Sequence, residues 1–308
     1  MPIFLNLRAR PSGGEVADQV SVAAVNLPPV ALDPATLKAI VKPPTAAPLA
    51  LSDLASRICG KNVLLATHGF NVNQQDGYQS LSNWLGLLRL DSSWVAIGVV
   101  WPGDSSWLGP LCYPGEGRHA MACGQLLAQF LFDNLAGANS LAFASHSLGA
   151  RFLLETVTAH NELSPAVAIR QVVIMAGAVN YDCLTNEFAA AAQSLDRINL
   201  LAASTDEVLS KAFPAGNVFE GIIDSGHPWF EAALGHSGPK QQLSGKFTGP
   251  FQVPDAWNFG HGSYLEIKPA CSPMLPLPLD VPTPNALAPY PKGFESSWVA
   301  AFVSSRLK

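Results

Sequence analysis

The sequence is poor in charged side chains. Only 13% of its 308 residues are Asp, Glu, Lys or Arg and the net charge is −5, whereas a charged share of about 25% is usual. No run of Lys and Arg occurs, and a protein that binds the nucleic-acid backbone needs clustered positive charge, so we expect no nucleic-acid partner. Hydrophobic residues make up 48%, a balance that mildly favours an apolar substrate.

Long uninterrupted apolar runs are also absent. None approaches the about 18–20 residues that a membrane-spanning helix needs, so no stable membrane insertion is expected. The N-terminus has a short apolar run followed by Arg8 and Arg10, whereas a secretory signal places its charges before a longer apolar core. The sequence therefore predicts a cytoplasmic protein.

Cysteine is scarce, and no two cysteines have metal-ligand spacing. The five are Cys59, Cys112, Cys123, Cys183 and Cys271. An odd number of widely spaced cysteines without a CxxC pair indicates reduced thiols rather than a disulfide framework or a zinc site. We therefore expect no metal and no cofactor.

Short apolar segments alternate with helical patterns through the middle of the chain. They lie at residues 62–67, 94–101, 141–144, 169–176 and 198–203, with helical spacing over 75–90, over 116–135 and from 150 onward. Continuously apolar strands that alternate with helices predict a mostly parallel, doubly wound α/β sheet with helices on both faces.

The ends of the chain differ from this core in composition. Residues 1–59 predict an N-terminal strand arm and then a Pro-rich connector, and residues 269–308 predict a Pro-rich extension that ends in a helix over 294–307. Between them, 60–268 is the expected catalytic core, with a short strand at its end over 264–267. We interpret 1–308 as one domain.

The most informative stretch is the pentapeptide SHSLG at residues 145–149. A strand, a tight turn with one serine among small residues, and a helix are typical of the nucleophile elbow of α/β-hydrolases. Ser147 is then the candidate nucleophile, and the backbone N–H of Leu148 forms half of an oxyanion hole. We expect the His146 side chain to point away across the turn. An ordinary turn with a capping serine remains the alternative.

A second turn, HGFN at residues 68–71, follows the first of these strands. In α/β-hydrolases such a turn supplies the other oxyanion-hole N–H, which here belongs to Phe70. We expect His68 to orient this loop rather than to act as a base. His68, Asn71 and His146 are further candidates for lining the substrate.

A serine nucleophile needs a base, and the base needs a carboxylate to orient it. Asp206 follows the strand predicted over 198–203, at the carboxyl end where such an acid must lie. Asp182, after the preceding strand, is the runner-up. Among the later histidines, His261 lies between two glycines in a loop that could reach the elbow. His227 and His236 are the alternatives, as residues of a lid or pocket.

Two loops carry candidate substrate-lining aromatics. The loop over 102–115 contains Trp107 and Tyr113 and follows a strand at its carboxyl end, where open α/β sheets bind ligands. The loop-rich region after residue 214 contains His227 and Trp229. The composition of these segments is about equally compatible with a lid over the substrate and with a packed surface loop.

Five motifs together resemble one family, the α/β-hydrolases of unknown function labelled DUF900, whose pattern runs HGYN, WPS, HSMG, SxxDxxL and GHSY. The matching segments are 67–71, 101–103, 145–149, 204–209 and 260–264. The resemblance implies Ser147, Asp206 and His261 as a catalytic triad. Two departures are Ser145 in place of a smaller residue and Gly262, which lengthens the last motif.

These features predict a cofactor-free serine hydrolase that cleaves carboxylic esters through an acyl-enzyme, as an esterase or lipase does. Its substrate would be a small-molecule or lipid-like ester. The alternative is a non-catalytic interaction module that has kept the α/β-hydrolase fold, because a fold does not fix a function.

Overall fold

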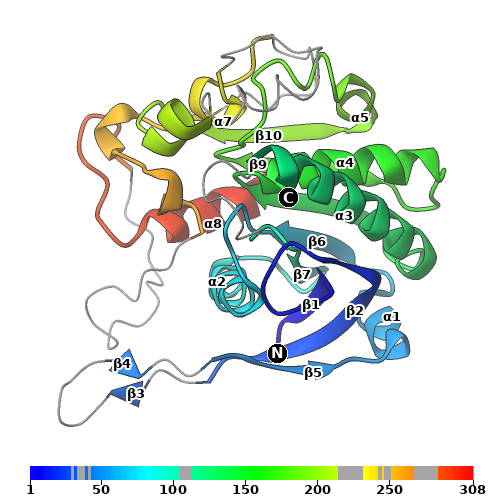
Figure 1. The fold of residues 1–308 in the computed structure, drawn as a ribbon. Coiled ribbons are helices and arrows are strands. Elements are labelled where there is room, and N and C mark those ends of the chain that lie inside the picture. The colour runs from blue at the N-terminus through cyan, green and yellow to red at the C-terminus, as the bar shows by residue number, and fades with distance from the viewer. Residues whose placement is uncertain are drawn as a thin grey trace.

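The central feature of the chain is one nine-stranded, mostly parallel sheet (Figure 1). The computed structural model describes residues 1–28, 31–32, 39–40, 43–104, 113–213, 232–241, 245, 251–265 and 284–307, without the side chains of 31–32, 39–40, 113–117 and 212. The strand order is β11-β10-β9-β8-β6-β7-β1-β2-β5. This confirms the predicted α/β class.

Seven neighbouring strands of this sheet are parallel to one another. They are β1 (Ile3–Arg8), β6 (Asn62–Thr67), β7 (Trp94–Val100), β8 (Ser140–His146), β9 (Ile169–Met175), β10 (Arg197–Ala202) and β11 (Phe251–Gln252). β2 (Val16–Asn26) and β5 (Thr45–Pro48) complete one edge, each antiparallel to its neighbour. β3 (Ala31–Leu32) and β4 (Ala39–Ile40) form a separate two-stranded sheet.

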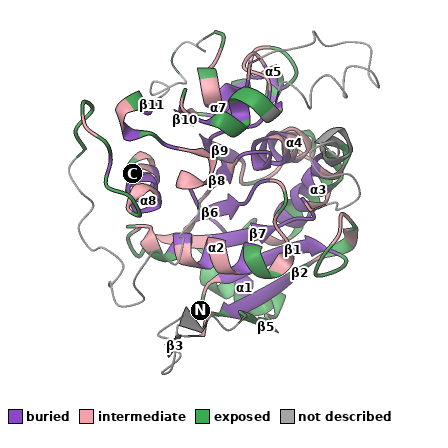
Figure 2. Cartoon of the chain, turned by 60° about the vertical axis from the view of Figure 1, so that its left-hand side comes forward, coloured by how far each residue is buried: buried purple, intermediate pink, exposed green. Residues whose placement is uncertain are grey.

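Helices cover both faces of the sheet. The α-helices are α1 (Leu51–Ile58), α2 (Gln74–Leu87), α3 (Tyr113–Asn134), α4 (Gly149–Glu162), α5 (Ala189–Ser194), α7 (Leu234–Ser237) and α8 (Glu295–Arg306). Phe143 of β8 packs edge-on against Phe152 of α4, and Phe4 of β1 packs edge-on against Tyr78 of α2. The central strands are buried between these layers, as the purple core of Figure 2 shows. No helix within the described residues is both long and apolar enough to cross a membrane.

The predicted N-terminal strands are present as the antiparallel pair β1 and β2, and both belong to the main sheet. Every residue of β1 is buried, and β1 pairs with β7 on one side and β2 on the other. Helix α1, within the expected Pro-rich connector, was not predicted from the sequence. It buries Leu54 and Ile58.

An aromatic cluster fixes the C-terminal part of the fold. Trp298 of α8 lies with its ring 5.3 Å from Phe251, 5.0 Å from Trp257 and 6.0 Å from Phe259, measured between centroids. The cluster therefore anchors the segment 251–265 against α8. The predicted terminal helix is confirmed as α8, but the predicted strand at 264–267 is wrong over its described part, since Tyr264 and Leu265 form a turn.

Candidate active site

Ser147 occupies the turn that joins β8 to α4. Its backbone is left-handed, with a φ of 55°, a conformation that a residue other than glycine keeps only when its surroundings hold it. Its N–H donates to the Met175 carbonyl, and its own carbonyl accepts from Ala150 and Ala178, all at 3.0 Å. β9 and the first turn of α4 therefore hold the serine in this strained turn.

Two glycines allow the segment after β6 to lie directly against this turn. A Cβ on Gly149 would lie 2.5 Å from the His68 carbonyl oxygen. A Cβ on Gly69 would lie 2.6 Å from Ser147 Cβ and 3.2 Å from its Oγ. Since real side chains do not approach so closely, the contact between the two turns requires glycine at both positions.

His261 lies between Ser147 and Asp206. Its Nε2 is 2.7 Å from Ser147 Oγ, and its Nδ1 is 2.8 Å from Asp206 Oδ2. The neutral tautomer with its hydrogen on Nδ1 satisfies both contacts, because Nδ1–H then donates to the carboxylate and Nε2 accepts from the hydroxyl. The three residues come from three different turns: the β8–α4 turn, the turn after β10, and a 3-10 turn at His261–Ser263.

The Asp206 side chain is fully buried and uses both carboxylate oxygens. Oδ2 faces His261, while Oδ1 accepts from the backbone N–H groups of Val208 and Leu209 at 3.1 Å each. Those two N–H groups belong to the π-helical turn Val208–Ala212, which follows the acid. The carboxylate therefore caps this turn and faces the histidine at the same time.

Further hydrogen bonds hold the histidine turn in place. Thr205 Oγ1 donates to the Phe259 carbonyl at 2.8 Å, and Gly260 N–H donates to Ser263 Oγ at 3.1 Å. Neither Thr205 nor Ser263 is among the site residues predicted from the sequence. Their places beside Asp206 and His261 in two of the five motifs were the available signal.

His146 contacts the histidine turn, so the expectation that its side chain points away from the site is wrong. Its Nε2–H donates to the His261 carbonyl at 2.8 Å, and the two rings lie 4.9 Å apart. Burial, followed by the neighbouring His261, lowers the pKa of His146 to about 3. A neutral His146 therefore bonds the backbone of the residue that faces Ser147.

His68 is buried beneath the turn that carries Phe70. Its Nδ1–H donates to the Gly69 carbonyl at 2.9 Å, and its Nε2 accepts from the Trp101 N–H at 3.4 Å. Burial lowers the pKa of His68 to about 4. Because both nitrogens have partners and the residue is only 1% exposed, it orients the loop, and its candidacy as a substrate-lining residue is not supported.

The two N–H groups expected to face an oxyanion have no acceptor among the residues that the structure describes. They are the backbone N–H groups of Phe70 and Leu148. Asn71 differs, because its N–H donates to the Gly103 carbonyl at 2.6 Å and its φ is 58°. Leu148 follows Ser147 directly in the chain, and Phe70 follows Gly69, which lies against Ser147.

The remaining candidates lie elsewhere or outside the description. Asp182 pairs with Lys240 (carboxylate oxygen to Nζ, 3.8 Å), and the ring of His236 contacts Ser237. His227, Trp229 and Trp107 lie outside the described residues; Tyr113 begins α3, but its side chain is not described. In the described part of the chain, no group of three or more His, Cys, Asp or Glu side chains could hold a metal ion.

The parallel sheet, the strained serine turn between β8 and α4 and the flanking helices define an α/β-hydrolase. The family model described as "Alpha/beta hydrolase of unknown function (DUF900)" matches residues 48–228, and the chain belongs to this family. The matched region contains Ser147 and Asp206 but ends before His261. It also leaves out β1 and β2.

Two solved structures are similar to the chain at low identity. One is described as RedJ with a PEG molecule bound in the active site, with 16% identity over 54% of this chain and 77% of that chain and a TM-score of 0.30. The other is acetyl xylan esterase 1 from Thermoanaerobacterium sp. JW/SL YS485, with 12% identity over 81% of this chain and 82% of that chain and a TM-score of 0.33. No curated protein matches the chain.

Proposed function

We propose that the protein is a serine hydrolase that cleaves carboxylic esters through an acyl-enzyme. The observation that carries the proposal is the continuous pair of hydrogen bonds from Ser147 Oγ through His261 to Asp206, at 2.7 and 2.8 Å. It begins at a strained serine between a strand and a helix. A nucleophile bonded to a base that is itself oriented by a carboxylate is the arrangement that activates a serine hydroxyl.

In the first half of the reaction, Ser147 Oγ bonds to the ester carbonyl carbon while its proton passes to His261 Nε2. The carbonyl oxygen becomes an oxyanion, to which the N–H groups of Phe70 and Leu148 donate. Asp206 stabilises the imidazolium through Nδ1–H. The bond to the alcohol oxygen then breaks, and His261 gives its proton to that oxygen, which leaves the acyl group on Ser147.

In the second half, water replaces the alcohol. His261 Nε2 takes a proton from the water as its oxygen bonds to the acyl carbon. The bond to Ser147 Oγ then breaks, and Oγ recovers the proton from His261 as the carboxylic acid leaves. This cycle uses only side-chain and backbone groups of the protein and water. The apolar composition favours a small-molecule or lipid-like ester as the substrate.

The test is turnover of p-nitrophenyl esters of increasing acyl length by the wild type, Ser147→Ala and Ser145→Ala. Ser145 is a matched control, since it lies two residues before Ser147 in β8, is fully buried and has an Oγ without a hydrogen-bond partner in the structure. We expect Ser147→Ala to lose turnover by a factor of about 10³ or more, with Ser145→Ala close to the wild type.

The chain-length series also tests the substrate class. A preference that rises from acetyl to longer acyl groups would support a lipid-like ester. A folded wild type that turns over no ester in the series would contradict the proposal and favour the non-catalytic interaction module.

A further inference from the structure

Arg8 is a buried cation at the end of β1, and it is not part of the catalytic contacts described above. Its side chain has no exposed surface, and it forms an ion pair with Asp104, whose side chain is 10% exposed. The register of β1 with β2 shifts between Asn6 and Arg8, and Arg8 N–H donates to Asn6 Oδ1 at 3.2 Å. Such an irregularity redirects a side chain out of the regular alternation of a strand.

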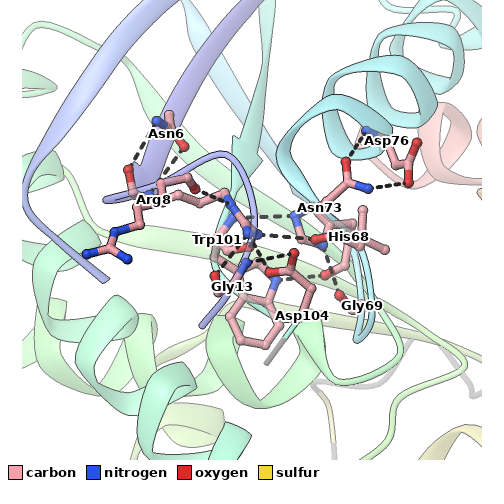
Figure 3. Close-up of polar contacts among 11 residues, drawn as sticks. Asn6, Arg8, Gly13, His68, Gly69, Asn73, Asp76, Trp101 and Asp104 are labelled. Carbon is pink, nitrogen blue, oxygen red and sulfur yellow. Dashed lines mark hydrogen bonds and ion pairs between the residues drawn. The ribbon is translucent and has the colours of Figure 1, made fainter. Parts of the chain in front are cut away.

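The Arg8 guanidinium joins three segments that are far apart in the sequence (Figure 3). Its Nη1 donates to the carbonyls of Val72 at 3.2 Å and Trp101 at 3.0 Å, and its Nη2 donates to that of Gly13 at 3.0 Å. Its Nε donates to the Arg10 carbonyl at 3.1 Å. Only the planar five-donor fork of arginine serves so many fixed acceptors at once.

Two of these segments bracket the turn that carries Phe70. Val72 lies two residues after Phe70. On the other side, Asp104 follows Gly103, whose carbonyl accepts the Asn71 N–H at 2.6 Å. The Trp101 indole N–H donates to the His68 carbonyl at 3.0 Å. The turn is therefore fixed at His68, Asn71 and Val72, and Arg8 bonds directly to two of the segments that fix it.

The β1–β2 connection adds a further bond to the same region. The Pro11 carbonyl accepts the N–H of Gln74, the first residue of α2, at 3.0 Å, and Gly13 N–H donates to Asp104 Oδ2 at 3.3 Å. Residues 8–13 thus contact both sides of the Phe70 turn, although they lie outside the region that the family model matches.

We propose that Arg8 is a positioning residue of this active site: it holds the loops at 69–72 and 101–104 together, so that the Phe70 N–H is aimed at the oxyanion beside Ser147. This role rests on the proposed hydrolase function. The loop at 69–72 lies close to Ser147, because a Cβ on Gly69 would lie 3.2 Å from Ser147 Oγ. A misplacement of about 1 Å at such a site lowers the rate by up to about 10²-fold.

The test compares the wild type with Arg8→Met, which keeps the unbranched apolar stem of the side chain and removes every side-chain donor. We expect kcat for p-nitrophenyl acetate to fall about 10- to 100-fold, with KM changed by less than about twofold, because the lost contact acts on the transition state. The pH dependence of kcat should keep its inflection, since Arg8 contacts neither His261 nor Asp206 in the structure. Arg10→Met is the matched control, because Arg10 lies in the same connection with a side chain that is 73% exposed.

A second variant covers the case in which Arg8→Met does not fold. Asp104→Asn leaves the four carbonyl contacts of Arg8 in place. It removes the charge opposite Arg8 and one of the two oxygens that accept from Arg8 and Gly13. We expect a loss of kcat of about 3- to 10-fold, smaller than for a lost oxyanion donor. A folded Arg8→Met with kcat within about twofold of the wild type would overturn the proposal. So would a folded Arg8→Met in which the inflection of the pH dependence of kcat has moved. If only Asp104→Asn folds, unchanged kcat in that variant would overturn it.

Hydrogen exchange separates this inference from the proposed function, because it needs no turnover. Peptides over residues 68–73 should exchange faster in Arg8→Met than in the wild type as the Asn71 N–H loses its fixed acceptor, while peptides over 204–209 should be unchanged. If the wild type proves inactive but shows this pattern, the proposed function fails and the structural role of Arg8 stands. Equal exchange over 68–73 in both proteins would refute the role of Arg8.

Discussion

Replacing Asp206 by Asn tests how the carboxylate orients His261, because the two side chains have nearly the same shape. The new amide oxygen can still accept from the backbone N–H groups of Val208 and Leu209, which Asp206 Oδ1 now binds at 3.1 Å. The amide nitrogen then faces His261 Nδ1, where a carboxylate oxygen lies 2.8 Å away in the wild type. Because that nitrogen is a donor, Nδ1 must become an acceptor, and the ring hydrogen moves to Nε2.

In that tautomer Nε2 cannot accept the proton of Ser147. We therefore expect kcat to fall by about 10³ to 10⁴, which corresponds to about 4 to 5.5 kcal/mol of transition-state stabilisation. The assay is steady-state hydrolysis of p-nitrophenyl acetate, with circular dichroism to establish that the variant is folded. Asp182→Asn is the matched control, since Asp182 also follows a strand of the sheet but pairs with Lys240. A large loss of kcat in Asp182→Asn without one in Asp206→Asn would refute the assignment of Asp206 as the acid.

Two further predictions concern single substitutions. Burial lowers the pKa of His160 from 6.5 to about 4. Between these two pH values the unfolded chain binds a proton at His160 and the folded chain does not. The free energy of unfolding therefore falls by about 1.4 kcal/mol per pH unit as the pH drops from 6.5 toward 4. His160→Leu should remove this contribution, as urea unfolding at pH 5 and pH 8 would show; an unchanged difference between the two pH values would contradict it. Gly69→Ala should abolish activity because its Cβ would lie 2.6 Å from Ser147 Cβ, whereas Gly86→Ala, with nothing within 4 Å, should keep it; full activity in Gly69→Ala would be inconsistent with the described contact.

The sequence predicted those parts of the fold that local patterns determine. The strands β6 to β10 are short apolar runs, and the turn at Ser147 needs only a few consecutive residues. The place of β1 between β7 and β2 could not be predicted in this way, because strand order depends on pairing between residues far apart in the chain. A six-residue, mostly apolar segment such as β1 has the same pattern in an arm as in a central strand.

In the candidate site, too, the residues within local motifs were predicted from the sequence, and the residue with distant partners was not. Ser147, Asp206 and His261 were identified from motifs and from their order along the chain, and the structure brings their side chains within hydrogen-bond distance. Arg8 was not identified, because its partners at Val72 and Trp101 are 64 and 93 residues away. A lone arginine at the end of an apolar strand was the available signal, since a buried cation requires partners.

The central claim is that Ser147 becomes covalently acylated, and the mass of the protein tests it most directly. We expect a fluorophosphonate to add one adduct to the wild type, located by peptide mass spectrometry on Ser147, with turnover lost in proportion to labelling. Ser145→Ala should be labelled as the wild type is, and Ser147→Ala should not be labelled. Labelling of Ser147→Ala at the wild-type rate, or an adduct on another residue that abolishes turnover, would contradict the account.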